Sequence, residues 1–203
     1  MGKEKRLFLL AVMTVMMSTA GYSEIKHDIN DGKTDYKNET EIITKSGDVG
    51  VRIKNGTFTN VKDKGTIIVN AGAGIFVSAD KGKEANFNND NIIEINGGKG
   101  IEIKTGTVNN AGTITINRAN NGIILSSSNS IFTNQGTIII KEKATLQDEK
   151  HNAISISNGT FNNNGNIENK DRILLSDGTF NNRKDKVLDN FGEIQITGGK
   201  FIN

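Results

Sequence analysis

The sequence predicts an all-β protein, a right-handed parallel β-helix (a solenoid) of about seven irregular coils. The first observation is a recurring sequence motif: an aliphatic triplet, then Gly-Thr-Phe or a variant, one or two Asn, a Gly and Thr-Ile-x-Ile. The second is that copies lie 19 to 29 residues apart, centred on Phe58, Phe87, Val108, Phe132, Phe161, Phe180 and Phe201. Self-similarity at such a period is typical of units that bury an apolar face only by stacking on their neighbours.

The third observation is the apolar pattern inside each copy. Residues 100–103 and 112–116 alternate strictly between apolar and polar, which is the two-residue period of a strand with one buried face. Gly, Asn, Asp or Ser bound each run, as expected at tight bends. Leucine-rich repeats have a similar period but need a Leu framework that is scarce here, and propeller blades are about twice as long.

Each copy can be assigned to positions in a coil. The inward residues are expected to stack on their counterparts about 4.8 Å away; they are Ile101, Ile103, Ile123, Leu125, Ile154, Ile156, Ile173 and Leu175. The Phe anchors should form an aromatic wall. The Asn that follow are placed at the turns, where amides in register can hydrogen-bond along the stack; they include Asn109, Asn110, Asn134, Asn162 and Asn163. A further corner, where a Cβ would clash or φ is positive, is assigned to Gly65, Gly112, Gly136, Gly165 and Gly192.

The composition agrees with stacked coils. The 203 residues include 23 Gly, 5% aromatic residues, and no Pro, Cys or Trp. Strands paired on both edges need every N–H group, which suits a chain without Pro. Without Cys there is neither a disulfide framework nor a thiol nucleophile.

The chain divides into three segments. Residues 1–23 are expected to be a signal peptide, because three basic residues precede an apolar stretch and small residues at a cleavage site. The mature chain then starts at Gly21 or Glu24. Residues 24–49 are interpreted as a polar segment that leads into and caps the first coil, and residues 50–203 as the repeat domain.

The charge balance argues against two classes of partner. Removing residues 1–23 takes away Lys3, Lys5, Arg6 and Glu4, which leaves 22 basic and 22 acidic residues. A neutral rod has no bulk basic signature for nucleic acid or anionic lipid. No other apolar stretch approaches the length of a transmembrane helix.

Two charged insertions break the repeat, at residues 141–151 and 182–189, and we expect them to protrude as loops. Per-repeat insertions of a solenoid map to one face and often bind ligands. The candidate binding residues are Lys141, Glu142, Lys143, Asp148, Glu149, Lys150 and His151. The alternative is that they are solvated insertions, tolerated because doubling a loop costs only about 0.6 kcal/mol.

No metal site, cofactor or catalytic site is predicted. Asp28, Asn30 and Glu39 match a calcium loop in part, but Lys33 stands where that loop needs Gly. The segment 97–103 resembles a calcium-binding nonapeptide, but its Asp is replaced by Glu102 and adjacent coils lack the ligand. The two His lie apart, and no carboxylate pair recurs on one wall. We therefore expect a protein that is not an enzyme.

The coils reading GTVNNAGTITI, IFTNQGTIII, GTFNNNGNI and NFGEIQITGGKFIN, after a secretory signal, resemble the passenger region of a bacterial autotransporter (type V secretion). The similarity is one of repeat style and covers about residues 50–203. It implies export and display of a β-helical rod outside a Gram-negative cell through a C-terminal outer-membrane barrel. The sequence stops inside a repeat without such a barrel, so we expect a fragment, located at the outer membrane if a barrel follows and in the periplasm if not.

The resemblance implies an adhesin or surface structural protein. Its partners would be a host-cell surface or extracellular-matrix ligand, together with other copies through the open C-terminal coil, since an apolar strand edge is a template for pairing. Two alternatives remain: a β-helical carbohydrate-active enzyme (a lyase or hydrolase), and a non-functional truncated remnant of a longer autotransporter.

Overall fold

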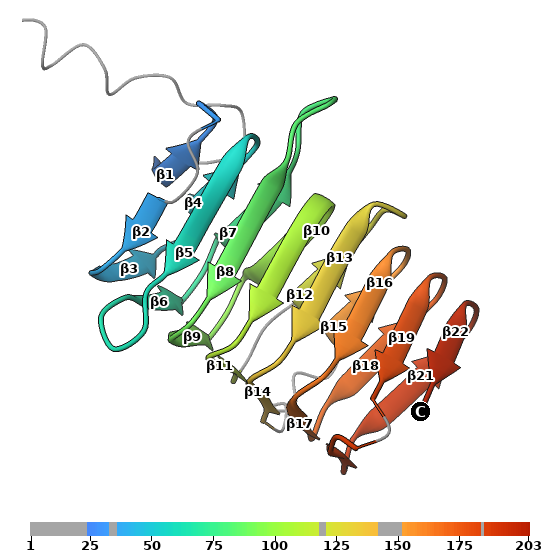
Figure 1. Cartoon of the computed structure of the whole chain (residues 1–203). Coiled ribbons are helices and arrows are strands. Elements are labelled where there is room, and N and C mark those ends of the chain that lie inside the picture. Colours follow the sequence, from blue (N-terminus) through green and yellow to red (C-terminus); the bar gives the residue numbers. More distant parts are fainter. Residues whose placement is uncertain (1–23, 33–35, 118–120, 142–151, 184) are drawn as a thin grey trace, which may run out of the picture.

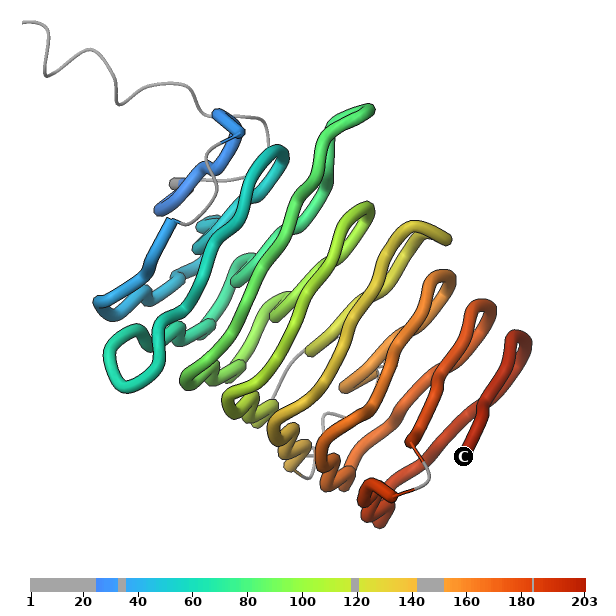
Figure 2. Tube along the Cα trace, viewed as in Figure 1, coloured from blue at the N-terminus to red at the C-terminus, as the bar shows by residue number. Residues whose placement is uncertain are grey.

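The structure, a computed structural model, describes residues 24–32, 36–117, 121–141, 152–183 and 185–203. This described part is all-β and contains no helix. The chain passes through three parallel ladders in a fixed order, and each passage, here called a coil, lies against the one before it (Figures 1 and 2). The prediction of an all-β chain of stacked parallel strands is confirmed.

The three ladders are named A, B and C in the order in which the chain visits them. Ladder A holds β1 (Glu24–Ile29), β4 (Asp48–Ile53), β7 (Ala73–Ser78), β10 (Lys99–Asn110), β12 (Asn121–Leu125), β15 (Asn152–Ile156), β18 (Arg172–Leu175) and β21 (Glu193–Ile196). Ladder B holds β2 (Tyr36–Asn38), β5 (Gly56–Asn60), β8 (Ala85–Asn89), the second half of β10, β13 (Ser130–Asn134), β16 (Thr160–Asn163), β19 (Thr179–Asn182) and β22 (Lys200–Ile202). Ladder C holds β3 (Glu41–Thr44), β6 (Thr66–Val69), β9 (Ile92–Ile95), β11 (Thr113–Ile116), β14 (Thr137–Ile140), β17 (Asn166–Asn169) and β20 (Leu188–Asn190).

Aliphatic side chains of ladder A form the predicted inward stack. Ile101 pairs with Ile123, Ile123 with Ile154, and Ile154 with Ile173. All four are at most 1% exposed. Each strand therefore buries its apolar face against the next coil, as the two-residue alternation predicts.

Aromatic rings form the second wall, on the inner side of ladder B. Tyr36, Phe58 and Phe87 are successive partners, and so are Phe132, Phe161, Phe180 and Phe201. Neighbouring ring centroids lie 4.8 to 5.7 Å apart with nearly parallel planes. Val108 interrupts the stack between Phe87 and Phe132.

A column of amides, buried except at Asn203, runs beside the rings. In each coil the Asn Nδ2 donates to the Asn Oδ1 of the following coil, over distances of 2.7 to 2.9 Å. The column consists of Asn38, Asn60, Asn89, Asn110, Asn134, Asn163, Asn182 and Asn203. The predicted amide ladder is confirmed. Its members up to Asn182 are the last residues of their strands, not turn residues as expected.

Glycine at the corner between ladders B and C allows successive coils to approach closely. A Cβ on Gly112 would lie 2.0 Å from the carbonyl oxygen of Asn91, and one on Gly136 would lie 2.0 Å from that of Gly112. Neither glycine has a positive φ, so the space and not the backbone conformation requires glycine. Gly192 was expected at this corner but lies between β20 and β21, hence between ladders C and A.

The stack begins one coil earlier than the Phe anchors indicate. Residues 24–49, expected to lead into and cap the first coil, contain β1, β2 and β3, which pair in register with β4, β5 and β6. Tyr36 takes the place of the Phe anchor and Asn38 that of the buried Asn. An alignment on Phe misses this coil because the aromatic residue differs.

Candidate functional site

The main predicted binding loop lies almost wholly outside the described residues. Lys141 directly follows β14 and is exposed to solvent. Glu142, Lys143, Asp148, Glu149, Lys150 and His151 fall in the segment 142–151, which the structure does not describe. Their role in binding therefore stays a prediction.

The second predicted loop, residues 182–189, is shorter in the structure. Asn182 ends β19 and is buried, and Leu188 and Asp189 belong to β20. The connection between them carries an exposed ion pair in which Arg183 Nε lies 2.8 Å from Asp185 Oδ1. Such exposed pairs add little stability.

The outer side of ladder B repeats the same kinds of side chain from coil to coil. In each strand the anchor residue (Phe, or Val108 in β10) and the last Asn point inward. The residue before the anchor and the residue between the anchor and the Asn therefore point outward. Eleven of the twelve outward residues from β5 to β19 are Thr or Asn. We call this set the polar strip: Thr57, Thr59, Asn86, Asn88, Thr107, Asn109, Ile131, Thr133, Thr160, Asn162, Thr179 and Asn181.

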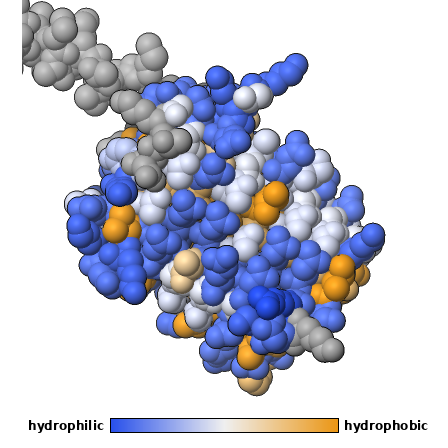
Figure 3. Space-filling view, in the orientation of Figure 1, coloured by the Kyte–Doolittle hydropathy of each residue, from blue (hydrophilic) through white to orange (hydrophobic). Residues whose placement is uncertain are grey.

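The polar strip carries no charge over six successive coils. By contrast, the outer sides of the other two ladders include Arg52 and Glu102 on ladder A and Glu94 on ladder C. The strip is bounded along the axis by Lys37 in β2 and Lys200 in β22. The side of the molecule that faces the viewer in Figure 3 is largely hydrophilic.

Hydrogen bonds along the stack hold part of the strip. Asn109 Nδ2 donates to Asn88 Oδ1 at 3.1 Å, and Asn181 Nδ2 donates to Asn162 Oδ1 at 2.8 Å. Each bond uses one of two N–H groups on the donor and one of two lone pairs on the acceptor oxygen. These amides are thus oriented by the protein and keep hydrogen-bonding capacity on the solvent side.

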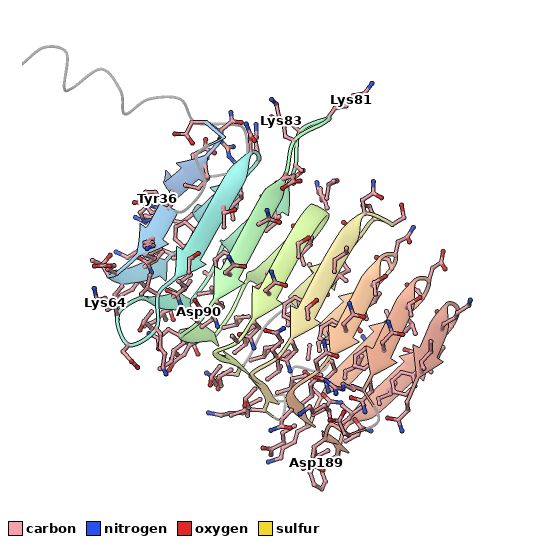
Figure 4. The ribbon with its side chains drawn as sticks, viewed as in Figure 1. Tyr36, Lys64, Lys81, Lys83, Asp90 and Asp189 are labelled. Atoms are coloured by element: carbon pink, nitrogen blue, oxygen red, sulfur yellow. The ribbon has the colours of Figure 1, made fainter. Side chains whose placement is uncertain are left out.

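Two projecting segments were missed by the sequence analysis. Residues 79–84 join β7 to β8 and extend beyond the A-to-B connections of the later coils, with Lys81 at the tip and Lys83 close to it (Figure 4). Residues 61–65 join β5 to β6, and there Lys64 Nζ lies 3.0 Å from Glu39 Oε2. The 29-residue step from Phe58 to Phe87 was the available signal, since both segments fall within it.

One histidine occupies a core row at the first coil. His27 in β1 pairs with Val51 and so continues the row of Ile75 and Ile101. Its ring centroid lies 5.1 Å from that of Tyr36 and 5.7 Å from that of Phe58. Burial against these rings lowers the pKa of His27, because the imidazolium loses hydration there.

The carboxylates considered for calcium have other partners. Asp28 accepts hydrogen bonds from both Nε and Nη2 of Arg52. Glu102 lies between Lys99 and Lys104, at 3.6 and 3.9 Å from their Nζ atoms. Within the described ranges, no group of three His, Asp or Glu could hold a metal ion.

Comparison with known proteins gives no family model, curated protein or solved structure that matches this chain. Within the part of the chain that the structure describes, no helix is long and apolar enough to span a membrane.

Proposed function

We propose that this chain is a right-handed parallel β-helix of the autotransporter-passenger type, displayed outside a Gram-negative cell as an adhesin or surface structural protein. The parallel ladders visited in the fixed order A, B, C support the β-helix. The right hand follows from the strong preference for right-handed crossovers between parallel strands of one sheet. The predicted signal at residues 1–23 supports export.

The observation that carries a role in recognition is the uncharged polar strip. The inward side chains and the backbone N–H groups of the ladders are used in stacking. A partner can therefore contact only the outer faces of the ladders and the segments that connect the strands. Stacked Thr and Asn can also occur for structural reasons, because Thr fits the pleated surface of a sheet and Asn amides in register hydrogen-bond along the stack. However, 24% of the residues in the chain are charged, so a continuous uncharged face favours a role of this surface in recognition.

Attachment assays with matched variants test this proposal. The full chain is added to cultured host cells and to surfaces coated with matrix proteins. We expect attachment, and its loss in the Thr107→Glu/Asn109→Asp variant of the strip but not in the Thr113→Glu/Thr115→Glu variant on ladder C. Those threonines lie in the same coil and are also partly exposed.

A loop variant separates the two candidate surfaces. Shortening residues 141–151 should leave folding intact. Loss of attachment in this variant alone would assign recognition to the loop predicted from the sequence. No attachment by the full chain would overturn the adhesin role.

The partners proposed are a host-cell or matrix ligand and other copies of the chain. Apolar side chains of the last coil support the latter: Ile196 is 50% and Ile202 is 52% exposed. Apolar strand edges promote pairing between chains.

A further inference from the structure

The dimensions of the polar strip limit what can lie on it. Six coils give five steps of about 4.8 Å, so the strip is about 24 Å long, and its two outward rows lie about 7 Å apart. A stable protein interface covers about 800 Å² on each partner, several times what two rows of short side chains offer. A strip of this shape matches one extended polymer chain lying along the coil axis.

The lack of charge limits the partner further. Anionic polymers are held by Lys and Arg, and basic peptides by Asp and Glu. No such residue interrupts the described rows between Lys37 and Lys200. The complementary partner is therefore uncharged.

The hydrogen-bonding groups of the polar strip favour a glycan over a peptide as the partner. A peptide strand binds a sheet mainly through backbone groups at an open edge, whereas the strip is the face of a ladder whose backbone groups are already paired along the stack. Thr hydroxyls and Asn amides both donate and accept hydrogen bonds, as sugar hydroxyls do. The Thr methyl groups and Ile131, which is 39% exposed, offer apolar contact to the C–H faces of sugar rings.

We propose that the polar strip binds one strand of a neutral, hydroxyl-rich polysaccharide aligned with the coil axis. This inference rests on the proposed role in recognition and names the class of ligand for it. The rows repeat with the coils, so successive sugar units along the strand would meet similar groups.

The test is calorimetric titration of the full chain with neutral hexasaccharides (cellohexaose, fully N-acetylated chitohexaose, maltohexaose and mannohexaose), their disaccharides, and heparin. We expect binding to at least one hexasaccharide, at least tenfold weaker binding of its disaccharide, and no competition by heparin. Thr107→Glu and Thr160→Glu, tested separately, should each weaken binding at least tenfold. Thr113→Glu on ladder C should change it less than twofold, and circular dichroism identifies any variant that fails to fold.

Three results would overturn the inference: no binding to any hexasaccharide, equal binding of hexasaccharide and disaccharide, or unchanged binding by both folded strip variants. A chain that attaches to cells or matrix but binds no neutral hexasaccharide would keep the proposed function and lose this ligand class. A chain that binds a hexasaccharide but attaches to neither cells nor matrix would keep the ligand class and lose the adhesin role.

Discussion

Asn110 shows how one residue type serves two purposes in this protein. Its side chain is buried in the amide column, where it accepts from Asn89 at 2.7 Å and donates to Asn134 at 2.8 Å. The preceding Asn109 points outward into the polar strip. The same residue type in adjacent positions therefore contributes to the core at Asn110 and to the surface at Asn109.

Replacing Asn110 with Leu should lower the free energy of unfolding by about 1–3 kcal/mol, because the amides of Asn89 and Asn134 each lose a buried partner. Replacing Asn109 with Leu should lower it less, because this side chain is partly exposed and water can replace its hydrogen bond to Asn88. Urea unfolding of both variants measures the difference. Equal losses would contradict the division between column and strip.

His27 should make the stability depend on pH. Its pKa in the folded chain is lowered below the ordinary value of about 6.5 by burial. Its ring meets those of Tyr36 and Phe58, its pairing partner is the apolar Val51, and the charged neighbours are Lys26 and Asp28 on the same strand. The unfolded chain binds the proton more readily, so this contribution is complete above pH 6.5 and is lost as the pH falls through the folded pKa.

Thermal unfolding between pH 7.5 and 4.5 tests this effect. The melting temperature of the wild type should fall more on acidification than that of the His27→Val variant. This variant has at position 27 the same residue type as its pairing partner, Val51. Parallel curves for the two proteins would show that His27 does not contribute.

At the scale of the strand, the sequence predicts the core well and the surface poorly. Alternation alone places Ile101, Ile123, Ile154 and Ile173 in one stack, because a half-buried strand has only two faces. It does not distinguish an outward Asn in a strand from an Asn in a turn, since both are polar and followed by a bend. The polar strip was missed for this reason: Asn109 and Asn162 were assigned to turns.

Alignment on the Phe anchors also hid features that depend on other residues. The first coil uses Tyr36 in place of Phe. Gly192 lies two residues after an Asn, as Gly112, Gly136 and Gly165 do, but the connection before β20 shifts it to the next corner. The register of such a coil is set by contacts with neighbouring coils, and a short sequence motif gives no information about these contacts.

A pair of adjacent substitutions in β12 tests the inward stack. Ile123→Asp puts an unpaired charge in the core and should cost several kcal/mol, enough to unfold a marginally stable chain. Ile124→Asp, on the outer face of the same strand, should cost much less. Melting temperatures of the two variants decide this, and an unchanged value for Ile123→Asp would contradict the stack.

At the scale of the whole molecule, the last coil differs from the interior. Ile194 and Phe201 are only partly buried, although their counterparts Ile173 and Phe180 are at most 1% exposed. We expect a chain that ends at Asn203 to self-associate through this coil.

Light scattering at increasing protein concentration checks the association. The Ile196→Lys/Ile202→Lys variant should remain monomeric at concentrations where the wild type associates, because charges on a strand edge oppose pairing. The Ile43→Lys/Ile92→Lys variant on ladder C, where exposures are 39% and 42%, serves as the control. A monomeric wild type at high concentration would contradict this expectation.

The stacked register is the claim on which the core, the strip and the proposed ligand all depend, and distances between spin labels measure it directly. The native chain has no Cys, so labels can be placed on Cys introduced in pairs at Thr59 with Asn162 and at Thr59 with Asn181. Following the paired register, these sites are four and five coils apart. Double electron–electron resonance spectroscopy should give distances of about 19 and 24 Å between the labels, an increase of about 4.8 Å for the additional coil. Distances that do not increase with coil number, or that exceed these values by more than the reach of the labels, would contradict the stack.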